Sequence, residues 1–364
     1  MRILRKRLHG EMWGITTYFN PVGYESKIRH LSRFALGVRK QGLKLLIIEM
    51  AFGNESYCVD PCICDRLVRV RGSSIMWQKE RLLNVAAQHL PATCDKLVLL
   101  DGDLSFENDR WVEHTCEELM RYPVVQPFAF AGWLCPDAMS RQDKWSLRSC
   151  ERASPGLAFA QSNICPGGFH GPGHWGFAWA FRKEIIDRCG FYDKFVLGGG
   201  DLAMAWAMYG SALVTPNQEK WLVRNCSPAQ ILDYENWREK FHNEIGGNVS
   251  YTQGAVYHYW HGSRENRRYW ARHLILKNAN FDPAVDICLD SDGTWKWAAY
   301  TSTKLQCDVK AYFIGRQEDG EKVRCLSGLP DGSPDPSNPQ PCLGLKCANK
   351  ILSDSGCIIK EGYT

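Results

Sequence analysis

The sequence of 364 residues lacks several features that would place it in a special class of protein. No run of about 18 apolar residues occurs, so no membrane span is predicted. The basic N-terminus, MRILRKRLHGEMWG, is not followed by an apolar stretch of about 7–15 residues, so we expect no secretory signal and a cytoplasmic location. No dense basic segment is present and the net charge is only +4, which argues against nucleic acid as a partner and suits a smaller anion such as a diphosphate.

Paired CxxC units are also missing, although the chain has 16 cysteines. The tightest group is Cys58, Cys62 and Cys64, whose spacing differs from that of common zinc sites. We interpret the cysteines mainly as free thiols that pack like small apolar residues. A set of disulfides in an oxidising compartment and a metal site at Cys58–Cys64 are the alternatives.

Strand-like and helix-like segments alternate in the first part of the chain, and 45% of all residues are hydrophobic. This alternation predicts an α/β fold with a mostly parallel central sheet flanked by helices. Ligands of such sheets bind at the carboxyl ends of the strands. The predicted strands are Trp13–Asn20, Lys44–Phe52, Lys96–Leu100 and Val124–Phe130, and the predicted helices are Ser26–Lys40, Met76–His89 and Asp109–Met120.

The second part of the chain is less regular. Residues from Cys135 to about Gly171 are rich in Pro, Gly and Ser, and we interpret them as an excursion over the active site. After about residue 325 the composition changes to Gly, Pro, Ser and Asp, with several cysteines. We therefore predict a catalytic domain over 1–325 and a tail over 326–364. Further predicted elements are a strand at Phe177–Phe181 and helices at Arg182–Cys189, Tyr234–Asn243 and Ser263–Leu276.

Two groups of residues have the chemistry of a metal site. Asp101-Gly102-Asp103 follows a buried apolar strand, and carboxylates there can bind a divalent cation with room for diphosphate oxygens. The alternative is an acidic turn that caps the next helix. His258 and His261 lie on one face if their segment forms a helical turn, and mixed carboxylate and imidazole ligands favour Mn²⁺ over Mg²⁺. Buried histidines bonded to the backbone are the alternative here.

Two further segments indicate substrate binding. Gly198-Gly199-Gly200-Asp201 allows close approach of the backbone to a ligand. Asp201 is either the N-cap of the following helix or a general base for an attacking hydroxyl. Trp77, Lys79 and Asn84 are predicted on one helix, where Lys79 either neutralises phosphate charge or is an ordinary solvated lysine.

These motifs occur in the order found in the β-1,4-galactosyltransferase group of GT-A glycosyltransferases, and the chain resembles that group over about residues 13–275. More distantly, it resembles polypeptide N-acetylgalactosaminyltransferases. The segments that carry the resemblance are TYFN from Thr17, LLIIEM from Leu45, WQKERLLN from Trp77, LVLLDGDLSFEND from Leu97, GFAWAFRKEIIDRCGFYDKFVLGGGD from Gly176 and HYWHGSREN from His258.

The resemblance implies a GT-A, Rossmann-like fold and a hexosyltransferase-type enzyme of inverting mechanism. A sugar would pass from a nucleotide diphosphate donor, expected to be a UDP-sugar, to a hydroxyl of a glycan, glycoprotein, glycolipid or other acceptor, with Mn²⁺ or Mg²⁺ as cofactor. The implied metal ligands are Asp103, His258 and His261, with Asp101 on the ribose or the ion. Asp201 would be the base. The other implied donor and sugar contacts are Thr17, Tyr18, Asn20, Glu49, Trp77, Lys79, Asn84, Gly176 and Gly199.

The chain departs from this group in three respects. Its acceptor segment reads FVLGGGDLAMA, without the Trp-rich and acidic run of the relatives, so N-acetylglucosamine is not implied as the acceptor. His258 stands where the relatives have Met. The relatives are usually anchored in the Golgi membrane, whereas this chain looks like a bacterial, phage or large-virus enzyme, in the host cytoplasm if viral.

Three other functions fit the sequence less well. A sugar nucleotidyltransferase would have a glycine-rich basic loop near its N-terminus, where this chain has TTYFNPVGYES. A non-catalytic sugar- or nucleotide-binding protein on the same fold would have lost the metal ligands or Asp201, and all of these are present. An enzyme that glycosylates bases in DNA would be expected to have a basic stripe.

Overall fold

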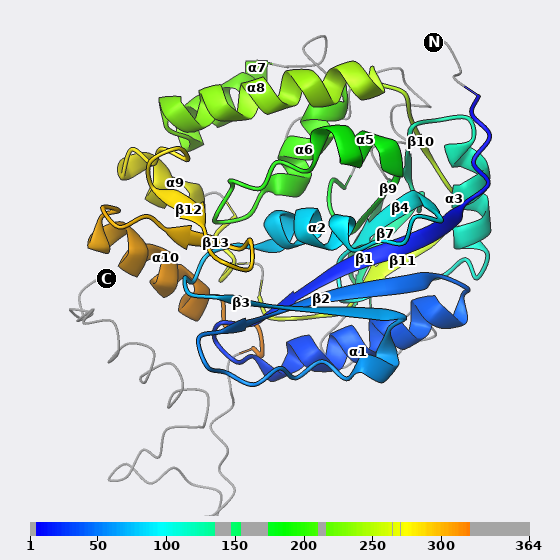
Figure 1. The fold of residues 1–364 in the computed structure, drawn as a ribbon, viewed down its shortest axis with the longest axis horizontal. Coiled ribbons are helices and arrows are strands. Elements are labelled where there is room, and N and C mark those ends of the chain that lie inside the picture. The colour runs from blue at the N-terminus through cyan, green and yellow to red at the C-terminus, as the bar shows by residue number, and fades with distance from the viewer. Residues whose placement is uncertain are drawn as a thin grey trace, which may run out of the picture.

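A seven-stranded sheet forms the centre of the molecule in the computed structural model (Figure 1). The structure describes residues 5–134, 147–153, 174–209, 216–263, 265–269 and 271–320, with only the backbone at 147–153 and 216–220. The predicted tail and most of the excursion from Cys135 to Gly171 lie outside these ranges. In spatial order the strands are β10 (Val249–Tyr251), β6 (Val124–Gln126), β9 (Ala178–Arg182), β4 (Cys94–Leu100), β1 (Glu11–Phe19), β2 (Lys44–Phe52) and β3 (Arg66–Gly72).

The central sheet is mainly parallel, as the sequence predicts. The strands β4, β1, β2 and β3 pair in parallel, and so do β10 and β6. The exception is β9, which runs antiparallel to both of its neighbours, β4 and β6. Because Leu100 pairs with Ala178, β9 begins at the edge of the sheet where β4 ends. The residues that precede β9 therefore lie beside the Asp101-Gly102-Asp103 turn.

Helices cover both faces of this sheet (Figure 1). On one face, α1 (Glu25–Lys40) and α3 (Trp111–Leu119) bury Leu31, Phe34 and Trp111 against the strands. On the other face, α2 (Lys79–Gln88), α5 (Lys183–Cys189), α6 (Gly200–Tyr209) and α8 (Pro228–Ile245) form a larger apolar core. Burial of apolar surface on both faces explains the continuous apolar runs of the central strands. The α/β class is thus confirmed.

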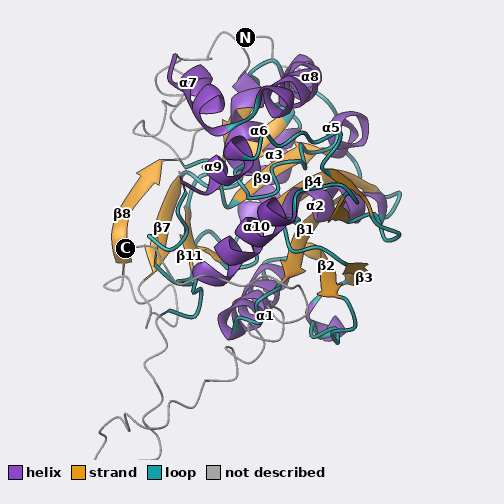
Figure 2. Ribbon diagram, turned by 90° about the vertical axis from the view of Figure 1, so that its left-hand side faces the viewer, coloured by secondary structure: helices purple, strands orange, loops and turns teal. Residues whose placement is uncertain are grey.

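A smaller four-stranded sheet carries the predicted metal-binding residue His258. Its strands lie in the order β5 (Leu104–Phe106), β11 (Ala255–His258), β7 (Phe130–Leu134) and β8 (Leu147–Ala153). In Figure 2, β7, β8 and β11 lie side by side at the left of the molecule. Antiparallel pairing of β11 with β5 places His258 opposite Leu104. The Tyr259 amide donates to the Asp103 carbonyl at 2.8 Å, so the two predicted metal-binding segments are joined through their backbones.

The remaining described elements follow in the C-terminal part of the chain, apart from one short 3₁₀ helix at Pro61–Ile63. They are α7 (Pro216–Asn225), α9 (Ala271–Asn278), the hairpin of β12 (Ile287–Leu289) and β13 (Trp295–Trp297), and α10 (Thr303–Gly315). Among the described residues, no helix is both long and apolar enough to cross a bilayer.

Most predicted elements are present, with three corrections. The strand predicted over Val124–Phe130 ends at Gln126, and a second strand, β7, begins at Phe130. The helix predicted over Ser263–Leu276 is instead α9, which begins at Ala271. The helical turn considered for His258 and His261 is wrong, because His258 ends strand β11. Cysteines 58, 62, 64, 94, 116, 189, 226 and 288 are free thiols, in line with our main interpretation, whereas Cys307 is disulfide-bonded.

Candidate active site

A cavity of about 770 Å³ opens at the carboxyl ends of β1 and β4. Such a position is where open α/β sheets bind ligands. Its wall is completed by the segment that precedes β9, the N-terminus of α6, the end of β11 and the residues that follow α10. It contains most of the predicted site residues, which are Thr17, Tyr18, Trp77, Lys79, Asp101, Asp103, Gly176, Gly199, Asp201, His258 and His261.

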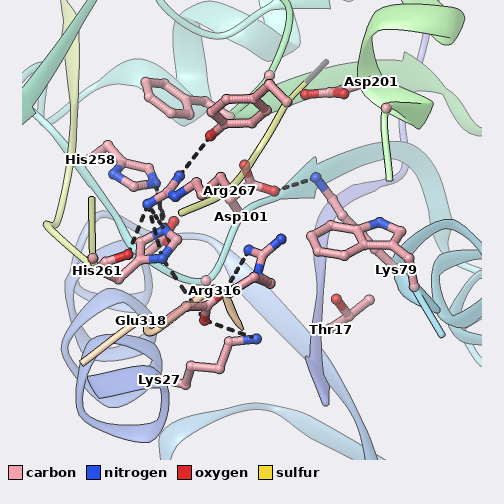
Figure 3. Close-up of a pocket in the computed structure, with 18 of the residues that line it drawn as sticks. Thr17, Lys27, Lys79, Asp101, Asp201, His258, His261, Arg267, Arg316 and Glu318 are labelled. Carbon is pink, nitrogen blue, oxygen red and sulfur yellow. Dashed lines mark hydrogen bonds and ion pairs between the residues drawn. The ribbon is translucent and has the colours of Figure 1, made fainter. Parts of the chain in front are cut away.

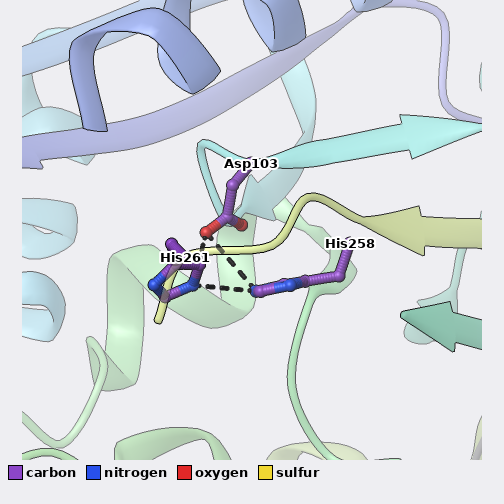
Figure 4. A group of neighbouring side chains, drawn as sticks. All are labelled: Asp103, His258 and His261. Carbon is purple, nitrogen blue, oxygen red and sulfur yellow. Dashed lines mark hydrogen bonds and ion pairs between the residues drawn. The ribbon is translucent and has the colours of Figure 1, made fainter. Parts of the chain in front are cut away.

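Asp103, His258 and His261 converge within this cavity, as Figure 4 shows. The Oδ2 atom of Asp103 lies 3.0 Å from Nε2 of His261 and 3.4 Å from Nε2 of His258. The two histidine Nε2 atoms are 3.1 Å apart, and the three ligand atoms all lie within 4.8 Å of one another. In the described part of the chain this is the one group of His, Cys, Asp and Glu side chains with such geometry, and Cys58, Cys62 and Cys64 are not gathered in this way.

The chemistry of this group fits a divalent cation. The Oδ1 atom of Asp103 is buried and has no hydrogen-bond partner among the described residues, which is costly unless an ion or ligand satisfies it. Burial lowers the pKa of both histidines, which keeps their rings neutral. Burial alone would raise the pKa of Asp103, but His258 and His261 lower it below its usual range. Neutral imidazoles and an ionised carboxylate are the forms that bind metals.

Lys79 and Asp101 form an ion pair beside this group (Figure 3). The side chain of Lys79 is only 12% exposed, so it is not an ordinary solvated lysine. Burial lowers the pKa of Lys79, yet the carboxylates of Asp101, Asp201 and Glu80 raise it above its usual value. Lys79 therefore carries a positive charge inside the cavity. Asp101 faces this ammonium group and lies outside the group formed by Asp103, His258 and His261.

Asp201 lies in the first turn of α6, where its Oδ1 atom accepts a hydrogen bond from the Leu202 amide at 2.9 Å. The loop before it needs glycine, because Gly198 and Gly199 have φ values of +85° and +100°. Asp201 faces the same cavity as Lys79 and Asp103, and in Figure 3 it lies at one side of the cavity, above Lys79. A carboxylate placed in this way can accept a proton from a bound hydroxyl.

Three predicted donor contacts do not line the cavity. Asn20 forms hydrogen bonds with the backbone of Tyr24, at 2.8 and 3.0 Å. Glu49 is buried and accepts hydrogen bonds from the amides of Cys58 and Val59. Asn84 exchanges two hydrogen bonds with the backbone of Phe191, at 2.8 and 2.9 Å. These polar side chains hold loops in place.

Sequence reasoning missed the basic residues that line the cavity, which are Lys27, Arg267, Arg272 and Arg316. Figure 3 shows Arg316 and Lys27 directed toward Glu318, and Arg267 beside the two histidines. Arg267 Nη2 lies 3.0 Å from Nε2 of His261. Arg267 follows the histidine motif closely in the sequence, and this short separation is a signal that could have predicted its place in the cavity. Lys27 and Arg272 lie on helices and Arg316 directly follows α10, and no recognisable motif marks these segments.

The segment after α10 is fastened to the N-terminus of α1. Asp319 accepts hydrogen bonds from the amides of Glu25 and Ser26 at 3.0 and 2.9 Å. A carboxylate at this position satisfies two free amides and interacts favourably with the helix dipole. Tyr24 accepts from the Gln317 amide at 3.0 Å. These contacts fix Arg316 and Glu318 in the wall of the cavity.

No family model matches the chain, and no curated protein matches it. Three solved structures illustrate its structural likenesses. Glucosyl-3-phosphoglycerate synthase from Mycobacterium tuberculosis, in complex with Mn²⁺, UDP and phosphoglyceric acid, is 12% identical, with 80% of this chain and 87% of that chain covered and a TM-score of 0.38. TarS 1–349 from S. aureus in complex with UDP is 8% identical, with 75% and 66% covered and a TM-score of 0.35.

The third structure is the catalytic domain of Drosophila β1,4-galactosyltransferase 7 in complex with xylobiose, 12% identical, with a TM-score of 0.29. The match covers 66% of this chain and 64% of that chain. This chain therefore spans less than two thirds of the length of the galactosyltransferase structure. TM-scores of this size establish no family membership. The function of the chain is therefore argued below from its own site.

Proposed function

We propose that the chain is a metal-dependent glycosyltransferase of the GT-A type that transfers a sugar from a nucleotide diphosphate donor to an acceptor hydroxyl. The observation that carries this proposal is that the cation-binding group of Asp103, His258 and His261 shares one cavity with Asp201. The first can bind the diphosphate of a donor through a metal ion, and the second can act as a base on an acceptor. A cavity of about 770 Å³ is large enough for both ligands.

The donor would lie along the end of β1 and β4. Thr17, Tyr18 and Trp77 line this part of the cavity and suit a uridine and its ribose. Lys79 and Arg267 supply positive charge next to the metal ligands. A divalent cation bound to Asp103, His258 and His261 would stabilise the negative charge that develops on the leaving nucleotide diphosphate. Mn²⁺ suits this ligand set better than Mg²⁺ because two of the ligands are imidazoles.

Asp201 would accept the proton of the acceptor hydroxyl as its oxygen attacks the anomeric carbon. The new glycosidic C–O bond forms while the bond between the anomeric carbon and the β-phosphate oxygen breaks. The electron pair of the broken bond leaves with the diphosphate, near Lys79 and Arg267. Attack from the face opposite the leaving group gives inversion at the anomeric carbon. The proposal includes three finer points. The transferred sugar is a hexose, the donor nucleotide is UDP, and the chain is related to the β-1,4-galactosyltransferases.

The proposal is tested by incubating the protein with UDP-, GDP-, CDP- and dTDP-sugars, with and without Mn²⁺, and measuring release of the nucleotide diphosphate. We expect Mn²⁺-dependent release from one donor and its loss in Asp103→Ala. The control is Asp308→Ala, at an exposed site on α10, which should behave as wild type. Absence of release and of donor-induced thermal stabilisation across the panel would favour a non-catalytic binding protein. Release of pyrophosphate from a nucleoside triphosphate and a sugar phosphate would favour a nucleotidyltransferase.

A further inference from the structure

Arg272 stands out among the charged residues of the cavity because it is buried without a carboxylate partner. It lies on α9, lines the cavity and is 7% exposed. Within the described residues, its hydrogen-bond partners are the Tyr312 hydroxyl at 3.0 Å and the His273 ring at 3.3 Å. Neither partner is a carboxylate: one is the phenol of Tyr312, and the other is His273, whose ring stays neutral because burial and the adjacent guanidinium lower its pKa. No carboxylate of the described residues therefore pairs with the positive charge of Arg272.

Three of the other basic side chains in the cavity have a carboxylate partner. Lys79 is paired with Asp101, and Arg316 and Lys27 are paired with Glu318. Arg267 also has no carboxylate partner among the described residues, but it lies against His261 and so belongs to the metal end of the cavity. An arginine stays protonated even when buried, and an unpaired buried charge is strongly unfavourable. A ligand with negative charge would remove this penalty at Arg272.

The location of Arg272 indicates which substrate would bring the negative charge. Its guanidinium packs against the loop that precedes Asp201, because a Cβ atom on Gly198 would lie only 3.3 Å from Nη1 of Arg272. Asp201 is the proposed base, and a base must contact the acceptor hydroxyl. A positive group beside that loop therefore faces the acceptor, whereas Lys79 and Arg267 face the donor.

The guanidinium of Arg272 is held in one orientation before any ligand binds. The ring of Tyr269 lies 5.2 Å from its Cζ atom, in a cation–π arrangement. The Tyr312 hydroxyl accepts hydrogen bonds from both Arg272 and Arg316, at 3.0 and 2.9 Å. A preorganised guanidinium binds carboxylate or phosphate oxygens in a bidentate manner at a smaller loss of side-chain entropy.

We propose that the acceptor carries a carboxylate or phosphate group and that Arg272 binds this group. This inference rests on the proposed function, since it assigns the acceptor class of the same cavity. The acceptor would be a sugar acid, a phosphorylated sugar or a similar hydroxylated anion. Its hydroxyl would reach Asp201 while its anionic group contacts Arg272.

The test compares three probes that differ only in their charged group: methyl β-D-glucopyranoside, methyl β-D-glucuronide and methyl β-D-glucopyranoside 6-phosphate. Binding of each is measured by isothermal titration to the full chain in the presence of Mn²⁺ and UDP. We expect at least one acidic probe to bind tenfold or more tightly than the neutral probe. This preference should disappear in Arg272→Gln and persist in Arg110→Gln, a control at an exposed position. Whichever acidic probe binds identifies the carboxylate or the phosphate as the ligand.

Two results would overturn the inference: acidic probes that bind no more tightly than the neutral one, or a preference that survives in Arg272→Gln. If the Gln variant does not fold, Arg272→Lys replaces it. That variant should keep a preference for acidic probes but reduce it several-fold, since a lysine cannot form the bidentate contact.

A parallel titration of UDP with Mn²⁺ separates this inference from the proposed function. Wild type and Arg272→Gln should bind UDP equally well. A loss of UDP binding in the variant would place Arg272 at the donor and contradict the acceptor assignment. If wild type does not bind UDP at all, the proposed function fails. The three probes, titrated without nucleotide, would then still decide whether Arg272 binds anions.

Discussion

Gly176 directly faces the carboxylate of Asp201: a Cβ atom at Gly176 would lie 2.8 Å from Oδ2 of Asp201. A methyl group cannot be added there without movement of the carboxylate. We therefore expect Gly176→Ala to lower sugar transfer at least tenfold, because displacement of about 1 Å at a catalytic group has a large effect. Mn²⁺-dependent UDP binding and the melting temperature should change little. The control is Gly37→Ala on α1, since beyond its chain neighbours and the helix's own backbone no atom lies within 4 Å of a Cβ added there. Unchanged sugar transfer in Gly176→Ala would show that the catalytic placement of Asp201 does not require a glycine at residue 176.

Replacing Asp201 tests its proposed role as a base. Asp201→Asn keeps the size of the side chain and its acceptor oxygen for the Leu202 amide, but it cannot accept the acceptor proton. We expect kcat to fall by about 10²–10⁴-fold, with the Kd for UDP and Mn²⁺ unchanged. Steady-state transfer assays with titration of UDP check both quantities. If Asp201→Asn transfers sugar at the wild-type rate, another group must be the base.

The ion pair of Lys79 and Asp101 should contribute to stability as well as to donor binding. Three carboxylates surround Lys79, so Lys79→Met leaves them without a positive neighbour. We expect a loss of about 2 kcal/mol in unfolding free energy, less than the roughly 3–5 kcal/mol for a fully buried pair, because Asp101 is 25% exposed. Asp101→Asn added to Lys79→Met should restore about 1 kcal/mol. Urea denaturation of the two single variants and the double variant measures this coupling, and strictly additive effects would contradict it.

Glu80 makes stability depend on pH. Burial is the main cause that raises its pKa from the usual 4.5 to about 7, with Lys79 opposing and Asp201 adding to the increase. The folded chain therefore holds this proton more tightly than the unfolded chain. The contribution of Glu80 to the free energy of unfolding is complete below pH 4.5 and is lost as the pH rises through about 7. The total loss of unfolding free energy is about 3 kcal/mol.

Urea denaturation at pH 5 and pH 8 tests this dependence. Glu80→Gln cannot ionise, so its stability relative to wild type should increase between the two pH values. The control is Glu239→Gln, at an exposed position of α8, for which no such change is expected. Parallel pH profiles of wild type and Glu80→Gln would contradict the prediction.

The main strands and much of the cavity could be predicted from the sequence. Lys44–Phe52 is a strand with the predicted bounds, because a continuous apolar run between two turns has few other solutions in an α/β chain. Asp103, His258 and Asp201 were predicted to act together, and they line one cavity. Strand ends of a parallel sheet meet at one edge, so motifs at those ends come close together.

Other features depend on tertiary contacts that local patterns do not encode. The sequence pattern does not predict strand β3, because arginines interrupt its apolar residues, as suits a strand at the edge of a sheet. The resemblance implies a donor contact for Asn84, whereas the structure places its side chain in two hydrogen bonds with the backbone of Phe191. Arg272 and Arg316 reach the cavity only because α9 and α10 pack next to it, and no motif marks these helices.

The fastening of the segment after α10 to α1 has a consequence for how the protein is made. Tyr24 and Asp319 belong to opposite ends of the described chain, yet their contacts complete the wall of the cavity. A ribosome releases the N-terminal strands first, and contacts between such distant residues form late because a long loop must close. The growing chain can assemble its central sheet well before it can hold a substrate. Activity should therefore be the last property that the nascent protein acquires.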